Sequence, residues 1–111
     1  MMIGNPGDAR LIEACDTFHN AYARYLRGCA AMAELEARGM DLPETEQALR
    51  WSSLQWQEAL CRVSRLRADA PPGALAKGGV LRSYLAERPI DDPYSRELTA
   101  SILADLDRLF G

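Results

Sequence analysis

The sequence has no long apolar run, and none of its stretches approaches the roughly 20 residues that a helix needs to cross a bilayer. The N-terminus lacks the basic region followed by an apolar stretch that marks a secretory signal. Net charge is small, because 16 acidic side chains oppose 13 basic ones in 111 residues. With 48% hydrophobic residues, this composition predicts one folded domain without a membrane span, located in the cytoplasm.

Cysteine and histidine are scarce. Cys15, Cys29 and Cys61 form an odd, widely spaced set, which fits neither a disulfide framework nor a zinc ribbon. His19, the sole histidine, follows Cys15 by four residues on the same helical face, and antiparallel helix pairing could bring Cys61 near both. Because a structural zinc site needs four ligands, we predict no metal and expect these residues to pack or hydrogen-bond at the edge of the core.

The groups that catalysis and phosphate binding require are also missing. A nucleophile built from Cys15 and His19 would have Asp16 one turn away, but a regular helix offers no oxyanion donors and no cleft. The pair Gly78-Gly79 follows Lys77 inside a helical stretch, which is the wrong order for a phosphate-binding loop. We therefore expect neither an enzyme nor a cofactor.

Helical periodicity is what the sequence has in quantity. Apolar residues at alternating spacings of four and three predict a helix over about 6–38, begun by Asn5 and Pro6 and ended by a left-handed cap at Gly39. Asp41 and Glu44 form a capping pair for a second helix over about 42–69, which Pro71 and Pro72 stop. The connection is so short that the two helices must form an antiparallel hairpin.

Two shorter helices are predicted to follow, over about 73–87 and 93–110. In the first, Gly78 and Gly79 would allow close packing on the hairpin. The second is capped by Asp92, and its apolar face comprises Leu98, Ile102, Leu103, Leu106, Leu109 and Phe110. The expected fold class is all-α: a long antiparallel helical hairpin plus two shorter C-terminal helices in one domain, bundle-like on oligomerisation.

The two C-terminal helices are too short to cover the whole hairpin. Its distal half, about 27–55, is therefore expected to remain bare. The helix over 42–69 supports this, because Trp56 and Leu60 lie on one side while Trp51 and Leu54 lie about 150° away. We predict a homodimer whose interface includes the distal apolar residues Met32, Leu35, Met40, Leu42, Trp51 and Leu54.

A possible basic patch gives an alternative interpretation. It comprises Arg62, Arg65, Arg67, Lys77, Arg82 and Arg88. Nucleic-acid binding is disfavoured, since cations are typical of a helix C-terminus, the chain is acidic overall, and no helix-turn-helix pattern is present. We expect instead that these arginines form a solvated face paired with Glu58 and Asp69.

The C-terminal part carries one resemblance. The segments Pro72-Gly73-Ala74-Leu75-Ala76-Lys77 and Ser101-Ile102-Leu103-Ala104-Asp105-Leu106-Asp107-Arg108-Leu109, with Leu81 and Tyr84 between them, resemble the ending of small uncharacterised helical-hairpin proteins from proteobacterial genomes and prophage regions. The resemblance implies a helical fold and no assigned activity. The expected function is a non-enzymatic helical interaction protein that self-associates, the alternative being a small nucleic-acid-associated or prophage-related regulatory protein.

Overall fold

The computed structural model describes residues 6–40, 42–87 and 92–111, and within them it confirms the all-α prediction. These residues form helices and connections without a β-strand. The helices are α1 (Pro6–Ala37), α2 (Pro43–Arg65), α3 (Pro71–Glu87) and α4 (Pro93–Phe110).

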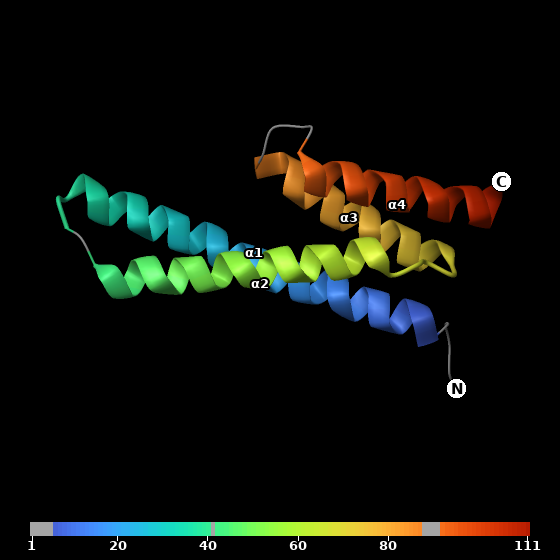
Figure 1. Ribbon diagram of the computed structural model, residues 1–111, viewed down its shortest axis with the longest axis horizontal. Coiled ribbons are helices and arrows are strands. Elements are labelled where there is room, and N and C mark those ends of the chain that lie inside the picture. The colour runs from blue at the N-terminus through green and yellow to red at the C-terminus, as the bar shows by residue number, and fades with distance from the viewer. Residues whose placement is uncertain (1–5, 41, 88–91) are drawn as a thin grey trace.

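The helices are arranged as two pairs (Figure 1). α2 runs back along α1, and α3 and α4 lie against the half of this pair that contains the start of α1 and the end of α2. The other half projects beyond α3 and α4, and we call it the distal half. The molecule measures 55 × 34 × 16 Å, and its radius of gyration of 16.3 Å exceeds the about 13 Å of a compact chain of this length.

The turn after α1 follows the predicted left-handed cap. Gly39 has φ +74°. The N–H of Met40 donates to the carbonyl of Leu35 at 2.9 Å and that of Gly39 to Glu36 at 3.0 Å, which together form a Schellman motif. The predicted caps Asn5 and Asp41 lie outside the described residues. Leu42 occupies the N-cap position of α2 without a side-chain cap bond.

The α2–α3 connection differs from the prediction. α2 ends at Arg65 rather than near residue 69, and α3 begins two residues earlier than expected, at Pro71. Leu66 has extended backbone angles. The next amides leave the helical pattern because carboxylates accept them: Ala68 donates to Asp105 Oδ1 at 3.2 Å and Asp69 to Asp8 Oδ1 at 2.7 Å. Tertiary hydrogen bonds have replaced the last helical turn.

Aromatic side chains form the centre of the core, where α1, α2 and α3 meet. Trp56 is 2% exposed, and its ring centroid lies 5.2 Å from that of Tyr22, 5.7 Å from Tyr84 and 6.4 Å from Phe18. This agrees with the predicted position of Trp56 on the inner seam. Asp92 caps α4 as expected, through a capping box with Ser95.

Two packing expectations are wrong. A Cβ added at Gly78 or Gly79 would meet no atom within 4 Å, so these glycines are not required for close helix approach. The apolar face of α4 is also narrower than predicted, because only part of it meets the other helices. Leu98 is buried, but Leu103 and Phe110 are 60% and 68% exposed.

Candidate functional site

An open groove runs along the side of α2 that faces away from α1. Its volume is about 590 Å³. Tyr94 of α4 closes one end, and the remaining lining comes from α2: Trp51, Leu54, Gln55, Gln57, Glu58 and Cys61. We call this feature the outer groove.

The outer groove exposes large apolar side chains. Trp51 is 63% exposed and Leu54 is 56% exposed, whereas Trp56 on the inner seam is 2% exposed. This contrast follows from helical geometry, since residues on opposite sides of one helix require different partners. The described helices cover the inner side of α2 and leave Trp51 and Leu54 on the outer side more than half exposed.

Hydrogen bonds fix the end of the outer groove nearest α4. The hydroxyl of Tyr94 donates to Gln57 Oε1 at 3.1 Å, and Gln57 Nε2 donates to Ser53 Oγ at 2.9 Å. The Tyr94 ring also lies 6.1 Å from the Trp56 ring. The groove therefore has one rigid end beside α4 and an open end toward the distal half.

The other predicted interface residues lie at different depths. At the tip of the distal half, Met40 and Leu42 are 46% and 37% exposed. Met32 and Leu35 are half-buried on α1. The exposed part of the predicted set is thus the tip and the outer side of α2.

The thiols and the histidine lie in separate environments. Burial, helped by the negative charge of Asp16, raises the pKa of the Cys15 thiol to about 11, although Lys77 acts in the opposite direction. The side chain is therefore protonated at neutral pH. His19 is exposed, with its ring edge-on to Phe18 at 5.6 Å. No group of three or more potential metal-ligating His, Cys, Asp or Glu residues occurs among residues 6–40, 42–87 and 92–111.

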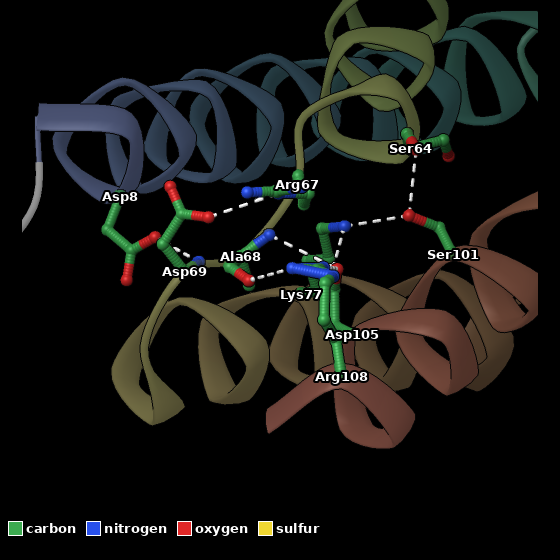
Figure 2. Close-up of polar contacts among 9 residues, drawn as sticks. All are labelled: Asp8, Ser64, Arg67, Ala68, Asp69, Lys77, Ser101, Asp105 and Arg108. Carbon is green, nitrogen blue, oxygen red and sulfur yellow. Dashed lines mark hydrogen bonds and ion pairs between the residues drawn. The ribbon is translucent and has the colours of Figure 1, made fainter. Parts of the chain in front are cut away.

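A buried ionic cluster, which the sequence analysis missed, joins α3, α4 and the α2–α3 connection (Figure 2). Lys77 is fully buried, and its Nζ lies 2.6 Å from Asp105 Oδ2 and donates to Ser101 Oγ at 2.7 Å. Ser101 in turn donates to the carbonyl of Ser64 at 2.8 Å. Lys77 was predicted as part of a surface basic patch, and this prediction is wrong because its charge is neutralised inside the molecule.

Asp105 is the centre of the cluster. It pairs with Arg108 as well as Lys77 and accepts the Ala68 N–H, while Arg108 also donates to the Ala68 carbonyl at 3.0 Å. Burial alone would raise the pKa of Asp105, but the hydrogen bonds from Lys77, Arg108 and the Ala68 N–H lower it below its usual value. The cluster is a closed structural clamp, since each charge already has a partner.

Asp8 makes a similar contact on the other side of the connection. Besides accepting the Asp69 N–H, its carboxylate lies against Gly73, where an added Cβ would lie 2.9 Å from Oδ2. Oδ2 is buried and has no hydrogen-bond partner among the residues that the structure describes. Asp8 thus holds the start of α1 against the start of α3, and only glycine fits at position 73 without a shift.

The remaining members of the predicted basic patch do not form a compact set with Lys77. Arg62, Arg65, Arg67 and Arg82 are exposed, whereas Arg88 lies outside the described residues. Arg67 Nε is paired with Asp69 Oδ1 at 3.1 Å. Four arginines of the predicted patch are therefore exposed, whereas Lys77, the only lysine in the sequence, is buried and does not contribute to a basic surface.

A second apolar surface was also missed. On α4, Leu103, Leu106 and Phe110 form an exposed stripe at spacings of three and four, and Leu75 of α3 is 76% exposed. The sequence pattern placed the α4 residues on a core-facing side because their spacing matches that of their buried neighbours. Only the packing distinguishes the two sets.

Comparisons with known proteins do not narrow the function of the chain. No protein-family model, curated protein or solved structure matches the chain. A separate finding concerns membranes: none of the described helices combines the length and the apolar character that a bilayer span requires. The resemblance to proteobacterial helical-hairpin proteins stays a prediction.

Proposed function

We propose that this protein is a non-catalytic helical interaction protein that associates with a second copy of itself through the outer groove and the distal half. One observation carries the proposal: Trp51 and Leu54, both more than half exposed, lie together in a groove that α3 and α4 leave open. Tryptophan is enriched at the energetic centres of protein interfaces. Paired hairpins of two copies would form a four-helix bundle.

The shape of the chain supports association. Its accessible surface is 7241 Å², about 1,100 Å² more than the scaling for a monomeric protein of this mass gives. A standard dimer interface buries about 800 Å² per partner. The elongated molecule therefore exposes enough surface for a stable interface, and its distal half projects beyond α3 and α4 (Figure 1).

The surroundings of the apolar residues also resemble an interface. On the distal half, Arg38 pairs with Glu34 at 2.7 Å and Arg50 with Glu46 at 3.8 Å, and all four side chains are more than half exposed. A polar, solvated rim around an apolar centre is the usual anatomy of a protein interface. The free thiols of Cys15, Cys29 and Cys61 suit a reducing compartment, which supports the cytoplasm as the place of assembly.

Sedimentation velocity at micromolar concentration tests the proposal. The wild-type chain should sediment at twice its mass of 12.3 kDa. Replacing Trp51 and Leu54 with alanine should weaken association by at least about 30-fold, since truncating an interface tryptophan commonly costs 2 kcal/mol or more. The helical signal should be unchanged, because both side chains lie outside the core.

A matched control uses the exposed stripe of α4. Replacing Leu103 and Phe110 with alanine removes a similar amount of exposed apolar surface at another place. This variant should remain dimeric. A wild-type monomer, or dissociation by the α4 variant alone, would overturn the proposal.

A further inference from the structure

We propose that two copies pair through α2 in antiparallel orientation, about a two-fold axis near residues 52–53, so that Trp51 of each copy contacts the partner's Leu54. This inference rests on the proposed function and specifies its interface. The partner surface is a second α2 because the outer groove has the residue pattern of a helix seam.

The pattern of that seam is a heptad. Trp51, Leu54, Glu58 and Cys61 all line the outer groove, at successive spacings of three, four and three. Gln47 extends the series by four residues toward the N-terminus. Such spacing keeps one face of a helix against one face of another. Trp51 and Glu58 occupy one type of core position, and Gln47, Leu54 and Cys61 occupy the other.

The charges at the two ends of α2 determine the orientation. Its first turn carries Glu44 and Glu46, and its last turn carries Arg62 and Arg65. Antiparallel pairing places the acidic end of one copy beside the basic end of the other, twice by symmetry, and also opposes the two helix dipoles. Parallel pairing would bring like charges together at both ends.

The register follows from the position of Leu54. In the proposed register Trp51 lies opposite the partner's Leu54, and the polar residue Glu58 lies opposite the partner's Gln47. A shift of one heptad in either direction sets Leu54 against a carboxylate, that of the partner's Glu58 or Glu44. Burying a carboxylate against an apolar side chain without a partner is costly. The proposed register avoids both arrangements, and its remaining carboxylate opposite a seam residue, Glu44 opposite Cys61, lies near the solvated end of the overlap.

The fold leaves room for this pairing. The axis near residues 52–53 lies between Trp51 and Leu54, which are 63% and 56% exposed, so this part of the outer side of α2 is open to a partner. Residues 43–62 of the two copies would overlap, a length of about 30 Å. The partner's C-terminal part of α2 would then lie along the bare N-terminal part of this one.

Disulfide crosslinking tests both orientation and register, because Cys61 would lie opposite the partner's Glu44. The variant Glu44→Cys, treated with the oxidant copper phenanthroline, should shift from 12.3 kDa to twice that mass on a non-reducing gel. Each crosslink joins two thiols, with two electrons passing to the oxidant and two protons to solvent. Within one chain the two sites lie 17 residues apart on α2, about 25 Å, so an intramolecular bond cannot form.

Three comparisons interpret the result. The control Glu44→Cys with Cys61→Ser should lose the crosslink, and the wild-type chain should form none. A wild-type crosslink through Cys61 would indicate parallel pairing and overturn the inference. A chain that sediments as a dimer yet fails to crosslink through Glu44→Cys would overturn the register alone, whereas a monomer in sedimentation would overturn the proposed function itself.

Discussion

The two members of the buried Lys77–Asp105 pair should differ in how much stability is lost when each is replaced. Asp105→Asn removes the carboxylate that lies 2.6 Å from Lys77 Nζ and leaves an ammonium group fully enclosed. Breaking a buried pair in this way costs about 3–5 kcal/mol. Lys77→Met is less severe, because Asp105 keeps Arg108 and the Ala68 N–H as partners. We expect it to cost about 1–2 kcal/mol, between the contribution of a neutral hydrogen bond and that of one to a charged group.

These losses are large for a domain whose total stability is of the order of 5–15 kcal/mol. With about 4 °C per kcal/mol for a chain of this size, Asp105→Asn should lower the melting temperature by about 12–20 °C and Lys77→Met by about 4–8 °C. Thermal unfolding followed by circular dichroism at pH 7 measures both. The wild-type chain, in which Asp105 is buried and paired with Lys77, is the reference for the melting temperatures of both variants.

The comparison of the two variants separates an unpaired charge from lost packing. Only Asp105→Asn leaves the Lys77 ammonium without the carboxylate that it contacts, whereas Lys77→Met removes the ammonium itself. Equal losses in both variants would refute the argument that an unpaired charge is the cause.

Three further predictions concern other parts of the molecule. Gly73→Ala should cost about 1–3 kcal/mol in a urea titration, since its Cβ would lie 2.9 Å from Asp8 Oδ2, whereas Gly78→Ala, with open space around it, should gain about 0.5–1 kcal/mol. Because the pKa of Asp105 is lowered in the folded state, its contribution to stability is present above the unfolded-state pKa of about 3.9 and is lost as the pH falls through the folded value, which acid titration by circular dichroism detects. Gel-shift assays at low salt should show no shift of duplex DNA, because the basic patch lacks Lys77; a shift that weakens steeply with salt would restore the nucleic-acid alternative.

Much of the fold was predictable because local rules determine it. Gly39 ends α1 by a conformation that glycine adopts freely, and Asp92 begins α4 by accepting amides that no helix bond satisfies. The contrast between Trp51 and Trp56 also follows from the sequence, since 100° per residue separates the two sides of α2. In each case the deciding interaction lies within one helix or at its end.

The missed features depend on contacts between distant parts of the chain. Lys77 lies in line with Gly73, Val80 and Tyr84 on the buried side of α3, so its position among core residues was a signal that a surface assignment ignored. Asp105 lies in line with Leu98 on α4 in the same way. Opposite charges in two buried stripes indicate an internal pair, but their approach depends on how α3 and α4 pack.

The ends of α2 and α4 illustrate the same limit. Propensity extends α2 to the prolines, yet the carboxylates of Asp8 and Asp105 attract the amides of the connection away from the helix. On α4, spacing alone could not divide Leu98 from Leu103, because both belong to one wide apolar arc. Tertiary geometry decides which residues of such an arc are covered.

The α2–α3 connection has a consequence for the order in which the chain matures during synthesis. The amide of Ala68 donates to a side chain 37 residues later, and its carbonyl accepts from a side chain 40 residues later. When the connection leaves the ribosome, the Asp69 amide can already donate to Asp8, whereas the amide and carbonyl of Ala68 have only water as a partner. The last turns of α4 supply Asp105 and Arg108, which bind the amide and the carbonyl of Ala68. A nascent chain stopped before Asp105 would therefore contain the aromatic core residues but not the ionic cluster with Lys77.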